Sequence, residues 1–306
     1  MKFLSYQNKD GELRLGILKD EHTVVDVHEA SEGALPDNIL SFLENSEKNM
    51  KLLQELNPAG KGLYSREEVL VKAPVPRPNS IRDFYAFEEH VKTARKKRGL
   101  DVVPEWYEMP VFYFSNHLAV KGDGEAIQRP ANCSWLDYEL EIACVIGKEG
   151  RNISRENAEE YIFGYCIMND WSARDLQREE MKVGLGPAKG KDFATSIGPY
   201  IVTKDELEPY RKDGRYDLKM TAKVNGQELS SGNFKSIYYT FAEMIERASA
   251  DVTLYPGEVI GSGTVGTGCI LELGTDVHRW LEPGDTVELE ITGLGKLSNK
   301  IKEGGF

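Results

Sequence analysis

The chain has 306 residues, of which 40% are hydrophobic and 29% are charged, and its formal net charge is −12. This length suits one large domain or a large domain plus a small one, and the composition is that of an ordinary globular protein. The acidic net charge argues against nucleic acid or an anionic membrane surface as a partner. We find no signal peptide, no transmembrane-length apolar run and no Cys-x-x-Cys pair among the four cysteines. We therefore expect a cytoplasmic protein with reduced thiols and no membrane partner.

The first seventy residues predict a small α+β unit. Turn-forming segments separate short apolar runs, and the runs indicate strands at residues 2–6, 12–18 and 23–27 and helices at residues 37–45 and 48–55. Further along the chain, residues 73–78 read Ala-Pro-Val-Pro-Arg-Pro. Such a segment is extended, because proline fits neither a helix interior nor a central strand. We place a domain boundary there, with residues 1–72 as a small N-terminal domain and residues 73–306 as the larger one.

Beyond this extended segment, Phe87, Val91 and Ala94 keep helical spacing within residues 86–98. The same helix carries a dense basic cluster, which consists of Lys92, Arg95, Lys96, Lys97 and Arg98. The cluster either attracts an anionic substrate or forms a solvated helix face, and we favour the solvated face. From the residues alone, Asp83 could cap this helix and His90 could be an ordinary half-buried histidine.

The most informative stretch runs from Trp135 to Asp170. Asp137, Glu139 and Glu141 alternate with apolar residues, so they share one strand face that continues into Ala143 and Val145. Glu139 and Glu141 are roughly 6.6 Å apart along such a strand and can converge on one cation. Residues 161–170 form an apolar run that ends in an aspartate, which is typical of a buried strand with a carboxylate at its tip. An all-oxygen set favours Mg²⁺, Mn²⁺ or Ca²⁺. The rival interpretation is an ordinary solvated face, as expected for Glu288 and Glu290.

The remaining glycine-rich segments do not predict a nucleotide site. Residues 184–192 lack the spacing and the Ser or Thr of a P-loop. Residues 261–266 match Gly-x-Gly-x-x-Gly, but the strand-like pattern of residues 269–273 follows where a dinucleotide fold needs a helix. Only the segments near 86–98, 155–161 and 237–249 have clear helical patterns. We therefore predict a mixed α/β fold dominated by strands.

Several separate motifs together resemble the fumarylacetoacetate hydrolase family over about residues 73–301. They are Asp83-Phe-Tyr85 with His90, Asp137-Tyr-Glu-Leu-Glu141, Met168-Asn-Asp-Trp-Ser-Ala-Arg-Asp175, Gly190-Lys-Asp-Phe193, Gly263-Thr264, Leu271-Glu-Leu273 and Pro283-Gly-Asp285. The resemblance implies a mixed β-sandwich roll, a homodimer, and one divalent metal per chain, Mg²⁺ or Mn²⁺ or else Ca²⁺.

The resemblance also implies roles for individual residues. By motif position, the metal carboxylates are Asp83, Glu139, Glu141 and Asp170. His90 matches the general base and Glu272 the acid that orients it, while Arg174, Gln177 and Lys191 match groups that stabilise negative charge on the substrate. Tyr85, Tyr113 and Thr264 match substrate-contacting positions. Tyr113 also suits a purely structural role in the apolar strand around residues 111–114.

The activity expected from this set is metal-dependent hydrolysis of a carbon–carbon bond in a small anionic keto acid. The substrate would be a 1,3-diketo acid of the acylpyruvate or fumarylacetoacetate type, with water activated by the His90–Glu272 pair. One alternative is metal-dependent decarboxylation or tautomerisation of oxaloacetate-like 2-keto acids, which needs no attacking water. A further alternative is a non-catalytic, metal-stabilised scaffold.

Overall fold

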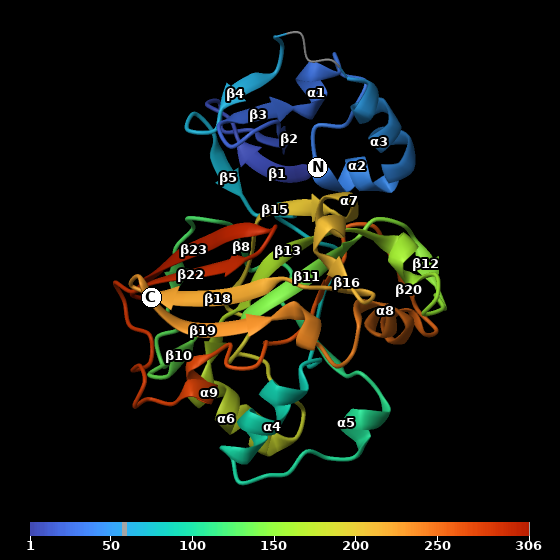
Figure 1. Ribbon diagram of the computed structural model, residues 1–306. Coiled ribbons are helices and arrows are strands. Elements are labelled where there is room, and N and C mark those ends of the chain that lie inside the picture. Colours follow the sequence, from blue (N-terminus) through green and yellow to red (C-terminus); the bar gives the residue numbers. More distant parts are fainter. Residues whose placement is uncertain (57–59, 306) are drawn as a thin grey trace.

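A computed structural model describes residues 1–56 and 60–305. Two β-sheets dominate it, a twelve-stranded sheet and a five-stranded sheet, and helices lie at both ends of the molecule (Figure 1). The long sheet has the order β4-β3-β2-β1-β15-β13-β11-β21-β6-β7, with β5 beside β1 and β8 beside β15. The short sheet has the order β19-β18-β22-β23-β9. Neighbouring strands are antiparallel except for the pairs β15–β8, β21–β6 and β23–β9.

The strands of the long sheet are β1 (Lys2–Gln7), β2 (Leu13–Leu18), β3 (Thr23–Asp26), β4 (Leu63–Ser65), β5 (Leu70–Lys72), β6 (Ile81–Phe84), β7 (Phe112–Ser115), β8 (Val120–Lys121), β11 (Leu140–Ile146), β13 (Ile162–Asp170), β15 (Thr195–Thr203) and β21 (Val259–Gly261). Those of the short sheet are β9 (Ile127–Gln128), β18 (Lys219–Val224), β19 (Gln227–Asn233), β22 (Thr286–Ile291) and β23 (Gly295–Lys302). Three two-stranded ribbons complete the set: β10 (Leu136–Asp137) with β14 (Ser172–Ala173), β12 (Gly150–Arg151) with β20 (Thr253–Leu254), and β16 (Arg211–Lys212) with β17 (Arg215–Tyr216).

The α-helices are α1 (Val27–Ala30), α2 (Ile39–Glu44), α3 (Ser46–Glu55), α4 (Glu88–Lys96), α5 (Glu105–Glu108), α6 (Arg174–Val183), α7 (Lys204–Leu207), α8 (Phe241–Ser249) and α9 (Ile270–Leu273). Three 3₁₀ turns are η1 (Ala158–Tyr161), η2 (Glu208–Tyr210) and η3 (Phe234–Ser236). The predicted strands and helices of the first fifty-five residues and the long helix near residue 90 are present. Two predictions were wrong, because residues 270–273 form a helical turn rather than a strand and because α6 was missed. The helix predicted near residues 155–161 is present only as the 3₁₀ turn η1.

The central strands β11, β13 and β15 are buried on both faces. On one face, Ile142, Cys144 and Tyr165 pack against the short sheet in the larger core. On the other face, Val145 and Phe163 pack in a second core that also contains residues from α2 and β1. The N-terminal strands therefore extend the same long sheet, since β1 pairs with β15 in antiparallel register. The boundary at residues 72 and 73 stays a prediction.

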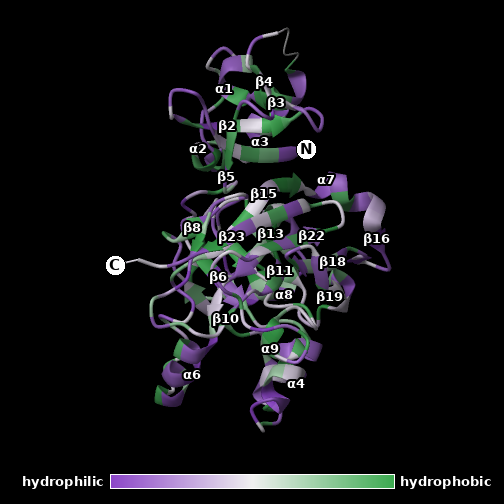
Figure 2. Ribbon diagram, turned by 90° about the vertical axis from the view of Figure 1, so that its left-hand side faces the viewer, coloured by the Kyte–Doolittle hydropathy of each residue, from purple (hydrophilic) through white to green (hydrophobic). Residues whose placement is uncertain are grey.

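The end of the molecule opposite the N-terminal strands carries α4, α6 and α9 (Figures 1 and 2). Apolar residues run through β13 and β15 in the middle, whereas α4 and α6 are mostly polar outside their buried faces (Figure 2). Among residues 1–56 and 60–305, none of the helices has the length and apolar character needed to cross a membrane.

Candidate active site

Three strands of the long sheet bring three acidic side chains to one place. Asp170 ends β13, Glu141 lies near the start of β11, and Asp83 lies near the end of β6. Glu141 pairs in register with Met168, two residues before Asp170, so both carboxylates share one face of the sheet. Asp83 joins this face from β6 through the intervening strand β21. The alternation in the sequence thus predicted correctly that the carboxylates point into an enclosed space.

Gly261 on β21 makes room for this arrangement. It pairs with Asp83 on one side and with Ala143 on the other. A Cβ atom at this position would lie 2.5 Å from Asp83 Oδ1, so a larger residue would displace the carboxylate. The backbone N–H of Gly263 donates to the same Asp83 oxygen at 3.2 Å. Asp83 is therefore a strand residue of the site and not the cap of α4.

The three carboxylates form a cluster that suits a cation. Asp83, Glu141 and Asp170 each offer an oxygen, and these oxygens lie within 4.8 Å of one another. Two oxygens of these residues, Glu141 Oε2 and Asp170 Oδ1, are buried without a hydrogen-bond partner among the described residues. Burial, and then repulsion between the carboxylates, raises the pKa of Asp83 and of Glu141 well above the usual range. Unpartnered buried oxygens of this kind fit a divalent, oxygen-seeking metal ion such as Mg²⁺, Mn²⁺ or Ca²⁺.

Glu139 lies beside this cluster but has different partners. Its Oε1 accepts from Arg174 Nη2 at 2.7 Å, and its Oε2 accepts from Lys191 Nζ. Lys191 Nζ also donates to Asp170. Burial would raise the pKa of Glu139, but Arg174 and Lys191 together hold that pKa well below its usual range. Glu139 as a fourth metal ligand therefore stays a prediction, because here both its oxygens are held by cations.

Asp137 supports the site, although we assigned it no role from the sequence. It is fully buried, and its Oδ2 accepts from Arg174 Nε at 2.9 Å. Its two oxygens also accept from the backbone N–H groups of Ile270 and Leu271, at the start of α9. Asp137 thus ties the guanidinium of Arg174 to the helical turn that carries Glu272. The sequence feature that could have indicated this role is the place of Asp137 on the acidic strand face, two residues before Glu139.

The remaining polar residues predicted from the family motifs surround the carboxylates. Tyr113 donates its hydroxyl to Asp170, and the same hydroxyl lies 3.4 Å from Asp83 Oδ2. Thr264 Oγ1 donates to Glu141 Oε1 at 3.4 Å, and Gln177 Oε1 accepts from Arg174 Nη1 at 3.2 Å. Tyr113 contacts two of the acids, so its position differs from that of a purely apolar strand residue.

His90 and Glu272 form a pair at the wall of the same space. His90 Nδ1 is hydrogen-bonded to Glu272 Oε1, and the His90 ring packs edge-on against Tyr85 with 5.3 Å between ring centroids. His90 lies on the buried face of α4 together with Val91 and Ala94. Glu272 Oε2 accepts from the backbone N–H of Thr267 at 3.0 Å. A carboxylate on Nδ1 fixes the imidazole so that Nε2 is the acceptor.

These groups meet at one cavity of about 860 Å³ between α4, α6 and the end of the long sheet. Ten of the twelve predicted site residues line it: Asp83, Tyr85, His90, Tyr113, Glu139, Glu141, Arg174, Gln177, Lys191 and Thr264. Asp170 and Glu272 lie just behind, bonded to Lys191 and His90 respectively. The basic cluster of α4 is divided, because Arg95, Lys97 and Arg98 also line the cavity whereas Lys92 pairs with Glu88. The assignment of that cluster to a solvated face is therefore incomplete.

The outer wall of the cavity contains an aromatic pair that the sequence did not reveal. Trp135 and Trp280 are stacked with 6.0 Å between ring centroids and 18° between ring planes. The guanidinium of Arg178 on α6 lies 5.8 Å from the centre of the Trp135 ring. Two tryptophans that are 145 residues apart in sequence meet only through the fold, so no local pattern could predict the pair.

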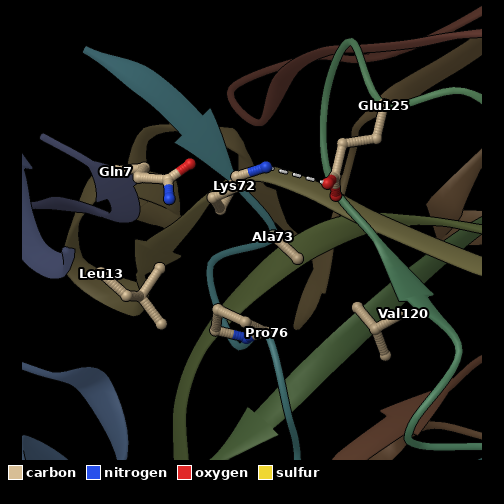
Figure 3. Close-up of a pocket in the computed structure, with 7 residues that line it drawn as sticks. All are labelled: Gln7, Leu13, Lys72, Ala73, Pro76, Val120 and Glu125. Carbon is tan, nitrogen blue, oxygen red and sulfur yellow. Dashed lines mark hydrogen bonds and ion pairs between the residues drawn. The ribbon is translucent and has the colours of Figure 1, made fainter. Parts of the chain in front are cut away.

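A second, smaller cavity of about 220 Å³ lies near β1 and β5 (Figure 3). Its lining contains one ion pair, between Lys72 Nζ and Glu125 Oε1 at 3.1 Å, and apolar side chains such as Leu13 and Val120. The two charges satisfy each other, and no other titratable side chain lines this cavity within the described part of the chain. The cavity between α4 and α6 is therefore the candidate active site.

Comparison with known proteins agrees with this geometry. The model of the fumarylacetoacetate (FAA) hydrolase C-terminal domain matches residues 79–302, and the chain belongs to this family. It is 29% identical to "Oxaloacetate tautomerase YisK" of Bacillus subtilis over 94% of this chain and 95% of that protein. It is 30% identical to human "Oxaloacetate tautomerase FAHD2A, mitochondrial" over 89% of this chain and 82% of that protein.

The fold is that of the same family. The solved structure of fumarylacetoacetate hydrolase from Exiguobacterium antarcticum superimposes with a TM-score of 0.78 and 28% identity, covering 99% of both chains. The predicted strand-dominated mixed α/β fold of the fumarylacetoacetate hydrolase type is thus confirmed.

Proposed function

We propose that this protein is a divalent-metal-dependent enzyme that interconverts the keto and enol forms of oxaloacetate-like 2-keto acids. The observation that carries the proposal is one cavity that presents both the His90–Glu272 pair and three clustered carboxylates with two unpartnered oxygens. Relatives named oxaloacetate tautomerase, which match over most of their length, support the choice of reaction.

The metal would be held by Asp83, Glu141 and Asp170. When bound, such an ion supplies Lewis-acid polarisation of the carbonyl oxygen of the substrate. The carboxylates themselves cannot bind the anionic substrate, because they repel it. A bound divalent ion, together with the nearby cations Arg174 and Lys191, would offset most of this negative charge.

His90 is the group that moves the proton. Its Nδ1 proton is shared with Glu272, so Nε2 carries the lone pair that can take a proton from the carbon next to the carbonyl. The same nitrogen then returns the proton, either to carbon or to oxygen, which balances the isomerisation without water. Glu272 keeps the imidazole in this tautomer and stabilises the charge that develops on it.

Lys191 and Arg174 would stabilise negative charge on the substrate oxygen. Lys191 Nζ donates to Glu139 and Asp170, which leaves one of its three N–H groups for a ligand. Burial opposes the charge of Lys191, yet Asp170 and Glu139 raise its pKa above the usual range, so it stays an ammonium ion. A fixed cation in a water-poor site stabilises developing negative charge far more than a cation in water does.

Hydrolysis of a carbon–carbon bond in a 1,3-diketo acid is the second candidate. The size of the cavity favours it, since about 860 Å³ and a stacked tryptophan pair exceed what a four-carbon diacid needs. In this reaction His90 would take a proton from water, the oxygen would add to the distal carbonyl, and the released carbon would be protonated.

Two substrates separate the candidates. The enzyme would be incubated with oxaloacetate and with acetylpyruvate, each with Mn²⁺ or with EDTA. Faster decay of the enol absorbance of oxaloacetate, with no net loss of oxaloacetate, supports tautomerisation. Loss of acetylpyruvate to acetate and pyruvate supports hydrolysis, and CO₂ release from oxaloacetate supports decarboxylation. Activity toward neither substrate would leave a non-catalytic, metal-stabilised scaffold as the remaining interpretation.

A further inference from the structure

A second cluster of potential metal ligands lies behind the base, and its chemistry differs from that of the carboxylates. His90, Cys269 and Glu272 each offer one ligand atom, and the three atoms lie within 4.8 Å of one another. Cys269 Sγ is 3.7 Å from Glu272 Oε1, the oxygen that is hydrogen-bonded to His90 Nδ1. All three side chains are buried, and His90 gives the cluster access to the large cavity.

The cluster is held in place by its backbone. Cys269 precedes α9 in an extended conformation, and Glu272 lies on that helical turn. Thr267 donates its backbone N–H to Glu272 Oε2 from a left-handed conformation, with φ of 66°. This conformation is costly for a β-branched residue, so the loop is shaped to fix Glu272. Nitrogen, sulfur and oxygen ligands thus converge on a rigid support.

We propose that His90, Cys269 and Glu272 form a second metal site that binds Zn²⁺ and that its occupation switches off the base. Imidazole, thiolate and carboxylate are ligands of Zn²⁺, whereas the all-oxygen cluster of Asp83, Glu141 and Asp170 suits Mg²⁺ or Mn²⁺. Ordinary Zn–S and Zn–O bond lengths in a tetrahedral site separate sulfur from oxygen by about 3.6 Å. The observed 3.7 Å between Cys269 Sγ and Glu272 Oε1 fits this separation. His90 Nδ1 and Glu272 Oε1 are now hydrogen-bonded to each other, so the ion would replace the proton between them and move these two atoms apart.

The inhibition follows from the two nitrogens of His90. Zn²⁺ at Nδ1 displaces the proton there to Nε2, and the Cys269 thiol loses its proton to solvent. Nε2 then carries a hydrogen and cannot accept a proton from the substrate. Glu272 is drawn to the metal at the same time and no longer orients the ring. This step requires the proposed role of His90 as base, but binding of Zn²⁺ to the cluster does not.

Burial keeps the Cys269 thiol unreactive in the absence of a bound metal ion. Burial, and then the nearby Asp137 carboxylate, raises the pKa of Cys269 well above its usual range. A free thiolate is therefore rare, which argues against oxidation as the function of this cysteine. A coordinating metal removes the thiol proton directly, so the same burial does not prevent coordination.

The experiment uses Cd²⁺ as the probe for binding and Zn²⁺ as the inhibitor, both in the full chain with saturating Mg²⁺. Cd²⁺ should produce the ultraviolet charge-transfer band of a cadmium thiolate, and one equivalent of Zn²⁺ should remove it. In Cys269→Ser the band should be absent, and the Zn²⁺ concentration that halves activity should rise tenfold or more. Each variant is compared with its own activity without Zn²⁺.

Two control variants locate the effect. Cys166→Ala removes another buried thiol, outside the cavity, and should keep both the Cd²⁺ band and the Zn²⁺ inhibition. Glu141→Gln should weaken Mg²⁺ binding and leave the Cd²⁺ band unchanged. Absence of the band in the wild-type protein overturns the site, even if Cys269→Ser fails to fold. A Cd²⁺ band without Zn²⁺ inhibition would support the metal site but contradict the role of His90 as the inhibited base. Zn²⁺ inhibition that excess Mg²⁺ relieves would contradict the proposed switch.

Discussion

At the scale of single residues, the site is governed by the cost of burying like charges together. Five carboxylates are buried in one region: Asp83, Asp137, Glu139, Glu141 and Asp170. Among the described residues, the buried cations bonded to them are Arg174 and Lys191. Glu139 and Asp137 are paired with these cations, whereas Glu141 Oε2 has no partner among the described side chains. Glu141 is therefore the residue whose charge most needs a metal ion.

Substitution of Glu141 should have opposite effects in the two states of the protein. Glu141→Gln should raise the melting temperature of the metal-free protein, because it removes one of three mutually repelling carboxylates. It should also reduce the stabilisation by Mn²⁺, which at a hundredfold excess over Kd is about 2.7 kcal/mol for the wild type. Thermal unfolding with EDTA and with Mn²⁺ measures both effects. Equal Mn²⁺ stabilisation of wild type and variant would show that the metal binds elsewhere.

Removal of the base should separate catalysis from metal binding. His90→Ala should lower the turnover number by about 10²–10⁴-fold, the usual contribution of a general base, and should leave Mn²⁺ affinity intact. Glu272→Gln should have a milder effect, because it removes orientation rather than the base itself. Steady-state kinetics and calorimetric titration with Mn²⁺ give the two quantities. If His90→Ala also loses the metal, His90 is a ligand or a structural residue.

Sequence patterns predicted the acids but could not distinguish their environments. Glu139 and Glu141 lie two residues apart on one face and look equivalent in the sequence. Their difference comes from Arg174 and Lys191, which are more than thirty residues away and approach only Glu139. Whether an oxygen of Glu141 has a partner thus depends on tertiary contacts, which the alternation of residues along a strand cannot predict.

At the scale of elements, the wrong predictions have different physical causes. Residues 269–273 alternate as a strand would, yet they form one helical turn because the buried carboxylate of Asp137 accepts its first N–H groups. Helix α6 carries so many charged residues that its single buried side chain, Arg174, gave no apolar stripe to recognise. Strands β11 and β13, by contrast, were predictable because both are long and apolar.

Asp137 should therefore matter more to stability than its distance from the metal cluster suggests. Asp137→Asn keeps the shape but weakens the bond to Arg174 and the acceptors for α9. We expect the free energy of unfolding to fall by about 1.5–3 kcal/mol, the usual worth of a hydrogen bond to a charged group. Urea denaturation measures the loss. Asp276→Asn, at an exposed position beyond α9, serves as the control and should be nearly neutral.

At the scale of the whole molecule, the carboxylate cluster should make stability depend on pH and metal together. Asp83, Glu141 and Asp170 have pKa values raised chiefly by burial, so the folded state binds their protons more tightly than the unfolded chain does. Their contribution to the free energy of unfolding is fully present below the unfolded pKa near ~4, and it is lost as the pH rises through the raised pKa values. The metal-free protein should therefore melt at a lower temperature at about pH 8 than at about pH 5.

Saturating Mn²⁺ should remove most of this dependence, because the ion replaces the protons between the carboxylates. The depressed pKa of Glu139 acts in the opposite sense, but only below its unfolded value near ~4. Calorimetric scans with EDTA and with Mn²⁺ at both pH values test the expectation. The same fall in melting temperature with and without Mn²⁺ would assign the pH dependence to other groups.

The second core joins the N-terminal strands and helices to the strands that carry the site, so we expect them to unfold as one cooperative unit. Phe42 on α2 lies 5.3 Å from Phe3 and 6.3 Å from Phe163 between ring centroids. Phe163 lies on β13, the strand that ends in Asp170. A loss of packing at Phe42 should therefore loosen the strand that positions a predicted metal ligand.

Phe42→Ala should lower the free energy of unfolding by about 3–5 kcal/mol, as expected for a large-to-small change in a core. The whole protein should still unfold in one calorimetric transition, shifted to lower temperature, and Mn²⁺ should raise that transition as it does in the wild type. Val183→Ala is the matched control, because this α6 side chain is 82% exposed and its truncation should cost almost nothing. A separate early transition that Mn²⁺ does not move would instead make residues 1–72 an independently folding domain, joined to the active-site unit only by the extended segment.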